Sequence, residues 1–152
     1  MNLDGHAAIV TGGGQGIGQG IALALAAEGA DIAVFDVNLT AAQDVAAVIT
    51  AQGRRALALE VDVTDHARVE ATTKEVVAAF RHLDLLVNNA GWTPNEPFAG
   101  STPETWRKIV AVNYFGVLNC TNAALTAMVP ARRVRRESAR PGRPSTRARK
   151  RR

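Results

Sequence analysis

Three glycines stand where they could do chemistry: Gly12, Gly16 and Gly18 in the segment TGGGQGIG. An apolar run at residues 7–10 precedes them, and a helix-forming segment follows. A pyrophosphate needs backbone N–H groups at a helix N-terminus and no Cβ atoms in its way, and glycines supply both. The spacing does not match Gly-x-Gly-x-x-Gly. Counted from Gly14 and Gly16, the position of the third glycine is occupied by Gln19. The strand before and the helix after still predict a dinucleotide-binding turn rather than a flexible loop.

An acidic residue, Asp36, ends the second apolar run. A carboxylate there can accept hydrogen bonds from the 2′- and 3′-hydroxyls of an adenosine ribose, and it would repel a 2′-phosphate. No lysine or arginine precedes Arg54, so nothing local in the sequence could neutralise that phosphate. The sequence therefore predicts NAD as the cofactor in preference to NADP. A solvated or helix-capping Asp36 is the alternative interpretation.

The elements that must position these residues alternate between short apolar runs and helical segments, a pattern typical of βαβ units and a parallel sheet. Predicted strands cover residues 7–10, 31–35, 56–61 and 83–87, and predicted helices cover residues 17–28, about 39–52, about 65–80 and 101–128. Ser101 and Glu104 form a capping-box pattern at the start of the last helix. The predicted fold class is α/β: a Rossmann-like doubly wound parallel sheet, truncated after the fourth strand and a long following helix.

The composition is that of a soluble globular protein. The chain has 152 residues, enough for one domain or part of one, with 47% hydrophobic and 21% charged residues. Its apolar stretches are interrupted too often for a membrane span, and no secretory signal is expected at the N-terminus. The single cysteine, Cys120, excludes an internal disulfide and indicates a reducing cytoplasm. We expect it to be a small apolar side chain rather than a catalytic thiol.

Charge divides the chain at residue 130. Residues 1–130 carry seven basic and thirteen acidic side chains, a net charge of −6, whereas residues 131–152 carry eleven and one, a net charge of +10. The basic segment cannot bury enough apolar area to offset the entropy of ordering it, so we expect an Arg-rich disordered tail at 131–152. Nucleic-acid phosphates could attract this tail, yet no recognition helix or interleaved aromatic residues accompany it, so a nucleic-acid partner is not favoured.

Four motifs follow one another along the chain: TGGGQGIG at 11–18, Asp62-Val63, NNAG at 88–91, and Asn113. With these motifs the chain resembles the short-chain dehydrogenase/reductase family over residues 3 to about 130. The resemblance implies a cofactor site at the carboxyl ends of the strands, with Asp62 and Val63 holding the adenine. The residues that we assign to the cofactor are Gly12, Gln15, Gly16, Ile17, Gly18, Asp36, Asp62, Val63, Asn88, Ala90 and Gly91. No metal site is predicted.

Several of these assignments have a purely structural alternative. Asp62 could only initiate a helix, and NNAG could only form a turn. By resemblance, Asn113 is the helix asparagine that organises a proton relay beneath a catalytic lysine, and it is the one catalytic residue predicted. A buried asparagine satisfied within the core is an equal alternative. Trp92 and Phe98 stand where the family's substrate pocket begins, or they cover the edge of the core as loop aromatics.

The resemblance also implies catalytic groups that the sequence does not contain. In the family a tyrosine in Tyr-x-x-x-Lys transfers the proton and a serine polarises the substrate oxygen. The only tyrosine, Tyr114, is followed four positions later by Leu118, and every serine falls in a helix cap or in the Arg-rich tail. The abrupt change of composition after Pro130 leads us to hypothesise a frameshifted or truncated product, which reading the gene's other two frames past residue 130 would test.

The resemblance implies an NAD-dependent oxidoreductase that interconverts a secondary alcohol and a ketone, with this chain catalytically incomplete. The alternatives are a noncatalytic NAD-binding module and, less favoured, a basic-tail nucleic-acid binder. The expected partners are a small-molecule alcohol or ketone and, as in the family, further copies of the chain; no membrane partner is expected. Missing strands would leave a sheet edge and an apolar helix face exposed, which predicts association or aggregation. The sequence does not identify the substrate.

Overall fold

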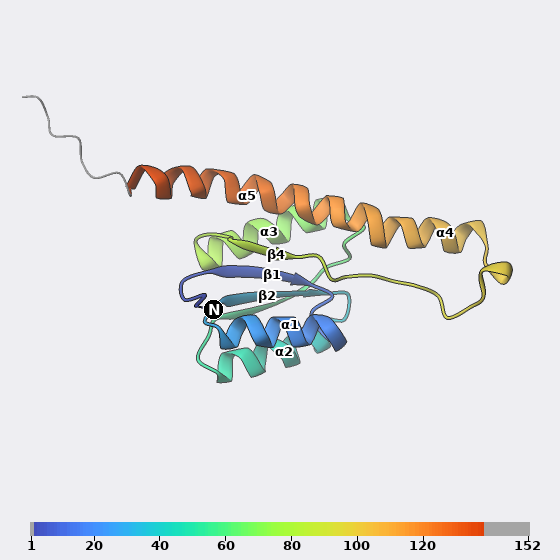
Figure 1. Ribbon diagram of the computed structural model, residues 1–152, viewed down its shortest axis with the longest axis horizontal. Coiled ribbons are helices and arrows are strands. Elements are labelled where there is room, and N and C mark those ends of the chain that lie inside the picture. Colours follow the sequence, from blue (N-terminus) through green and yellow to red (C-terminus); the bar gives the residue numbers. More distant parts are fainter. Residues whose placement is uncertain (1, 139–152) are drawn as a thin grey trace, which may run out of the picture.

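A four-stranded parallel sheet forms the centre of the molecule in the computed structural model, which describes residues 2–138 (Figure 1). The strands are β1 (Ala7–Thr11), β2 (Asp31–Asp36), β3 (Ala56–Glu60) and β4 (Leu85–Val87). Their order is β3-β2-β1-β4, and all three pairings are parallel. Because the strand order reverses at β1, the connections leave it in opposite directions, and ligands of such sheets bind outside the carboxyl ends of the strands there. The predicted α/β class, a Rossmann-like doubly wound parallel sheet, is confirmed.

Helices cover both faces of the sheet. The helices α1 (Gly16–Ala27) and α2 (Leu39–Ala51) lie on one face, and α3 (His66–Phe80) and α5 (Gly116–Ser138) lie on the other (Figure 1). Every residue of β1 and β2 is buried, which explains why these strands are unbroken apolar runs rather than alternating ones. Two apolar cores result, one on each side of the sheet.

Local side-chain signals set the ends of the first three helices. Asn38 caps α2, where its Oδ1 accepts a hydrogen bond from the Ala41 N–H at 3.1 Å. Asp65 caps α3 in the same way, with the Arg68 N–H at 2.9 Å. Gly29 follows α1 with a φ of +106°, the left-handed conformation that a helix stop needs. These elements lie within two residues of their predicted bounds.

The stretch after β4 departs from the single helix that the sequence predicts. A short 3₁₀ turn, η1 (Phe98–Gly100), precedes α4 (Pro103–Val110), which continues through a π-helical segment, η2 (Ala111–Phe115), into α5. The cap of α4 is Thr102 and not Ser101, because Pro103 takes the first helical position, where its missing N–H costs nothing. The Ser101 hydroxyl instead donates to the Phe98 carbonyl and accepts from Trp106 Nε1.

The helix α5 ends at Ser138, eight residues past the predicted boundary at 130. The expectation of disorder from residue 131 is therefore wrong for 131–138, whose backbone is helical. Alanine, arginine and glutamate are among the best helix formers, so this segment can extend a helix that is already nucleated without a core of its own. The rest of the predicted tail, residues 139–152, lies outside the described residues.

The α4–η2–α5 stretch is apolar on its outside as well. One helical stretch of the described chain, Pro103–Val129, is long and apolar enough to cross a membrane by length and composition alone, because residues 109–129 carry no charge. The expectation that every apolar run is too interrupted is wrong there. Core helices of globular proteins meet the same criterion. We call its exposed large side chains the outer apolar face: Trp106, Val110, Phe115, Leu118, Leu125 and Val129.

Candidate functional site

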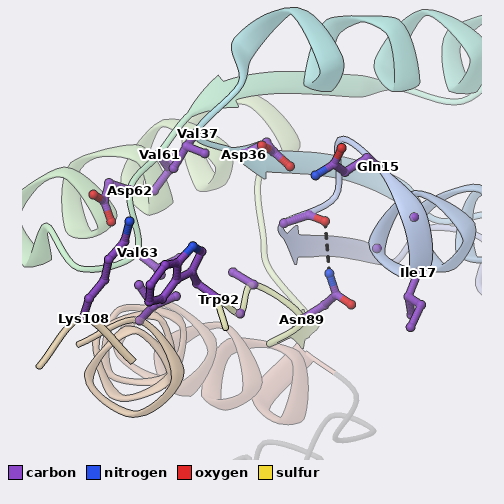
Figure 2. A pocket seen from close by; sticks show the side chains of 16 residues that line it. Gln15, Ile17, Asp36, Val37, Val61, Asp62, Val63, Asn89, Trp92 and Lys108 are labelled. Carbon is purple, nitrogen blue, oxygen red and sulfur yellow. Dashed lines mark hydrogen bonds between the residues drawn. The ribbon is translucent and has the colours of Figure 1, made fainter. Parts of the chain in front are cut away.

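A cavity of about 610 Å³ lies at the carboxyl ends of the strands, where they pass into α1, α2, α3 and the loop after β4 (Figure 2). It brings together all the residues assigned to the cofactor from the sequence except Asn88. It is lined by Gly12, Gln15, Gly16, Ile17, Gly18, Asp36, Val37, Val61, Asp62, Val63, Asn89, Ala90, Gly91, Trp92, Lys108 and Val112. Segments far apart in the sequence therefore meet around one space at the expected end of the sheet.

The glycine turn owes its shape to two different requirements. Gly18 has no room for a side chain, because a Cβ there would collide with the Gly12 carbonyl and with the Asn89 amide. Gly16 has a φ of +55°, which favours glycine, and nothing lies within 4 Å of where its Cβ would be. The turn is thus closed against the protein on one side and presents bare backbone to the cavity on the other.

The first turn of α1 faces the cavity with its backbone donors available. In the described chain its N-cap residue, Gln15, makes no side-chain capping hydrogen bond, and no acidic residue stands in that turn. Uncapped N–H groups and the helix dipole together make a helix N-terminus attractive to an anion. Beside them Ile17 projects outward with 78% of its surface exposed, so an apolar wall adjoins the anion-attracting backbone.

Asp36 is buried, with only 8% of its surface exposed, so the solvated alternative is wrong. Its Oδ2 accepts a hydrogen bond from the Gly14 N–H at 2.9 Å, and its Oδ1 accepts one from the Asn38 N–H at 2.9 Å. The carboxylate therefore ties the glycine turn to the start of α2. It also lines the cavity, where its remaining lone pairs can accept further hydrogen bonds.

The Asp62-Val63 pair is positioned from both sides. Asp62 Oδ1 accepts from the N–H and the hydroxyl of Thr64, at 2.9 and 2.8 Å, while a different residue, Asp65, caps α3. Asp62 is therefore not the helix-initiating residue. The Val63 carbonyl accepts from Asn119 Nδ2 of α5 at 2.9 Å, and a Cβ on Gly116 would lie 2.6 Å from a Val63 methyl carbon. Close contact with α5 thus fixes this loop.

The side chains of Asn88 and Asn89 have different surroundings. Asn88 turns away from the cavity, and its Nδ2 donates to Thr121 Oγ1 of α5 at 3.1 Å. Asn89 lines the cavity, and its Nδ2 donates to the carbonyls of Thr11 and Gly12 at 3.1 and 3.0 Å. Successive side chains of extended backbone point to opposite sides, so two adjacent asparagines cannot both face the cavity. The Asn88 side chain is therefore not part of the lining of this cavity, and the assignment of Asn88 to the cofactor stays a prediction.

Thr11 completes the link between the ends of β1 and β4. Its hydroxyl accepts from the N–H groups of Asn89 and Ala90, at 3.1 and 3.0 Å, and donates to the Val87 carbonyl at 3.2 Å. Together with the Asn89 amide, these bonds lock the NNAG segment onto the glycine turn. NNAG is therefore more than a turn, since it fixes the floor of the cavity.

Asn113 holds the backbone of Trp92 at two points. Its Oδ1 accepts from the Trp92 N–H at 2.8 Å, and its Nδ2 donates to the Trp92 carbonyl at 2.8 Å. Asn113 stands in the π-helical segment η2 and is exposed, so the alternative of an asparagine buried in the core is wrong. The residue belongs to the frame of the cavity, one layer behind its lining.

Lys108 and Trp92 are two of the lining residues that the sequence did not assign to the cofactor. Lys108 Nζ lies 4.1 Å from the centre of the Trp92 ring, a cation–π contact. Val112 lines the same cavity one helical turn after Lys108, and Val37 and Val61 line it beside Asp36. The i, i+4 spacing of 108 and 112 was the available signal, but it identifies a cavity-facing side only once the helix is placed.

The described residues offer few candidates for acid–base or nucleophilic chemistry in this cavity. Tyr114 is exposed, packs edge-on against Phe115, and does not line the cavity. Cys120 is buried in the core on the α5 side, where burial raises the pKa of its thiol to about 11, as expected for a structural cysteine. Within residues 2–138, no group of three or more His, Cys, Asp or Glu side chains is placed to hold a metal ion.

Known proteins with this arrangement are numerous. The chain is 38% identical to the sorbitol dehydrogenase of Cereibacter sphaeroides over 85% of its own length and 49% of that protein's. It is 39% identical to a 3-oxoacyl-[acyl-carrier-protein] reductase of Staphylococcus aureus, over 82% and 51%. A crystal structure of a short chain dehydrogenase from Burkholderia cenocepacia in complex with NADP superposes with a TM-score of 0.80 at 39% identity, over 84% and 53%.

The chain spans about half the length of the curated relatives that it matches. The family model of the short chain dehydrogenases matches residues 6–138, which is nearly all of the described chain. The glycine turn, the buried acidic residue after β2 and the NNAG segment all lie within the matched region and meet at one cavity. On this evidence, the chain belongs to the short-chain dehydrogenase family of oxidoreductases.

Proposed function

We propose that this chain binds a nicotinamide dinucleotide, NAD in preference to NADP, as the cofactor-binding part of an oxidoreductase that interconverts a secondary alcohol and a ketone. The observation that carries the proposal is the uncapped N-terminus of α1, opening with bare glycine backbone into a cavity that also holds the buried Asp36 carboxylate. An anion-attracting helix end and a hydroxyl-accepting carboxylate in one space match a pyrophosphate joined to a ribose.

The residues present fit such a cofactor from end to end. The first turn of α1, with Gly16, Ile17 and Gly18, would hold the pyrophosphate, and Asp36 would accept from the adenosine ribose. Asp62 and Val63 would hold the adenine. Gly12, Gln15, Ala90 and Gly91 would line the remainder of the cofactor. A side chain at Gly16 would project into open space that the cofactor would occupy. The absence of a side chain there fits the binding of a cofactor against the backbone.

The preference for NAD rests on the position of Asp36. A 2′-phosphate on the adenosine ribose would meet a buried carboxylate, and burial strengthens repulsion between like charges. Lys108 of α4 also lines the cavity and brings a cation into it. Its ammonium lies over the Trp92 ring, and no ion pair joins it to a carboxylate among the described residues.

When bound, the nicotinamide ring accepts or donates the hydride. The sequence has no tyrosine followed four positions later by lysine, so we propose that the 152 residues bind the cofactor without turning over. Asn113 would act only through its hold on the Trp92 backbone and, in the presence of a catalytic lysine, through the proton relay. A noncatalytic NAD-binding module is the second candidate function, favoured by the exposed position of Tyr114 outside the cavity.

Binding of NADH and NADPH to the purified chain, measured by calorimetry, tests the proposal. We expect NADH to bind at least about tenfold more tightly, a difference of ~1.4 kcal/mol. Asp36→Ser should reduce that ratio, because serine removes the charge and keeps an acceptor. Asp44→Asn, which removes an exposed carboxylate of α2, is the matched control and should leave the ratio unchanged. Equal affinities for the two cofactors would contradict the preference, and robust ketone reduction would contradict the proposed lack of turnover.

The other expectations from the sequence stay predictions. These are the division of the chain near residue 130, its frameshifted or truncated origin, the cytoplasmic location, the formation of homo-oligomers and the absence of a nucleic-acid partner. The relatives act on unlike compounds, as the names sorbitol dehydrogenase and 3-oxoacyl-[acyl-carrier-protein] reductase state. We therefore propose a small-molecule alcohol or ketone substrate and no narrower class.

A further inference from the structure

Trp92 and Lys108 form a part of the cavity wall that the proposed cofactor contacts leave unused. Trp92 comes from the loop after β4, and Lys108 from α4, and both line the cavity together with Asp62 and Val63. Figure 2 shows the two side chains beside Asp62 and Val63, whereas Ile17 stands at the other side of the view. The pair therefore belongs to the end of the cavity where the adenine would lie.

The Trp92 ring is held in this position from two directions. The two hydrogen bonds between the Asn113 side chain and the Trp92 backbone fix that backbone, so only the side-chain torsions of Trp92 remain free. The Lys108 ammonium occupies one face of the ring at 4.1 Å from its centre. Trp92 also lines the cavity, so part of its ring faces the space that a planar partner could occupy.

We propose that Trp92, with Lys108 over its opposite face, is the stacking wall for the adenine ring of the bound dinucleotide. This inference rests on the proposed function and deepens it by assigning an affinity-determining residue to one end of the cofactor. Every nucleobase has a π-face, and stacking on an aromatic side chain contributes to binding without base-specific hydrogen bonds. Asp62, in the same part of the cavity, offers carboxylate oxygens to an exocyclic amino group.

Lys108 could instead bind a phosphate group of the cofactor, and the position of its ammonium distinguishes this role from support of a stacked ring. A lysine that served a phosphate would have its ammonium free to reach that anion, whereas here it lies over the indole ring. A stacking wall predicts that fragments carrying adenine are sensed by Trp92 and that fragments without adenine are not. A phosphate contact predicts sensitivity to phosphate whether or not adenine is present.

The experiment uses the full chain with Trp106→Phe, which leaves Trp92 as the only tryptophan. Trp106 stacks on Phe98 and hydrogen-bonds Ser101, and it does not line the cavity. We expect ADP-ribose and AMP to quench the Trp92 fluorescence in a saturable way, and nicotinamide mononucleotide to leave it unchanged. Calorimetry should show that Trp92→Leu weakens ADP-ribose binding by about 5- to 100-fold, the range that base–aromatic stacking spans, while Trp92→Phe retains most of the affinity.

Lys108→Met should weaken ADP-ribose binding by only about two- to fivefold, since the cation acts through the ring. Quenching by nicotinamide mononucleotide as strong as by AMP, or unchanged ADP-ribose affinity in folded Trp92→Leu, would overturn the stacking wall while the proposed function stands. If the folded parent chain binds no ADP-ribose, both fail. Circular dichroism reports folding, and should Trp92→Leu not fold, the fluorescence titration with the ring intact decides the question.

Discussion

The two helical layers of the sheet differ in how completely they bury their apolar surface. On the α1–α2 side, small residues such as Ala22, Ala26 and Ala42 pack against the sheet and are almost fully buried. On the other side, α5 buries Cys120, Ala123 and Ala124 in the same manner, but the outer apolar face of α4–η2–α5 is left exposed. The first layer leaves few large apolar side chains exposed, whereas the second exposes a larger apolar face, the kind of surface on which proteins associate.

The largest expected effect of a single substitution is at Gly18, where the glycine turn after β1 passes into α1. Gly18→Val should abolish saturable NADH binding and lower the free energy of unfolding by about 1–3 kcal/mol or more, because any side chain there collides with backbone. Gly20→Ala is the matched control in the same helix, with nothing within 4 Å of the new Cβ, and should raise the free energy of unfolding by about 0.5–1 kcal/mol. Calorimetry and urea unfolding measure both. Equal effects at the two positions would refute this account of the turn.

The next effect concerns the lock between the glycine turn and NNAG. Asn89→Leu removes the donor that serves the Thr11 and Gly12 carbonyls, so we expect a loss of about 1–3 kcal/mol of stability. Asn88→Leu removes only an exposed hydrogen bond to Thr121 of α5 and should lower the free energy of unfolding by less than about 0.5 kcal/mol. Urea denaturation of the two neighbours decides the matter. A larger loss of stability for Asn88→Leu than for Asn89→Leu would contradict the importance of the hydrogen bonds from Asn89 to the glycine turn.

The outer apolar face should govern association of the chain. Leu118→Lys combined with Leu125→Lys should reduce the apparent mass on size-exclusion chromatography without lowering the free energy of unfolding, because both side chains are about half exposed. Val48→Lys, at a comparably exposed site on α2, should change neither property. A parent chain that elutes as a monomer at every concentration would contradict the prediction that the outer apolar face causes association.

The smallest effect tests the buried side of α5. Because burial raises the pKa of Cys120 to about 11, the folded chain at pH 8 holds roughly 100-fold less thiolate than a thiol of ordinary pKa near 9. Labelling by a maleimide should therefore be slow in buffer and fast in urea. The raised pKa also predicts that stability is full below about pH 9 and falls as the pH rises toward 11, where only the unfolded chain ionises readily. Fast labelling of the folded chain would show that α5 opens easily.

Sequence reasoning succeeded where the signal is local. The glycine turn and the apolar runs of β1 and β2 are each set by neighbours within a few residues, so their patterns predicted them. It failed where the outcome depends on partners far along the chain. Which of Asn88 and Asn89 faces the cavity depends on the exact end of β4, and no spacing reveals that Lys108 lies over Trp92.

The stretch from α4 to α5 shows the limit of helix signals in particular. An unbroken helical pattern predicted one helix, and the π-helical segment around Asn113 within it leaves no mark in hydrophobic periodicity. The segment coincides with the two hydrogen bonds between Asn113 and the Trp92 backbone, which join residues 21 positions apart. The extension of α5 past Pro130 was missed because the prediction relied on composition and on the proline, although alanine, arginine and glutamate after it favour a helix.

Asp36 gives this molecule a constraint that matters to anyone redesigning it. The carboxylate to which we attribute the proposed preference for NAD is also the acceptor for the Gly14 and Asn38 N–H groups. The same two oxygen atoms would thus serve both the proposed cofactor recognition and the loop, so a substitution such as Asp36→Ser also removes an acceptor that the loop uses. A variant meant to accept a phosphate must supply new acceptors for both amides, so a change of cofactor here requires a small redesign of the loop and not a single substitution.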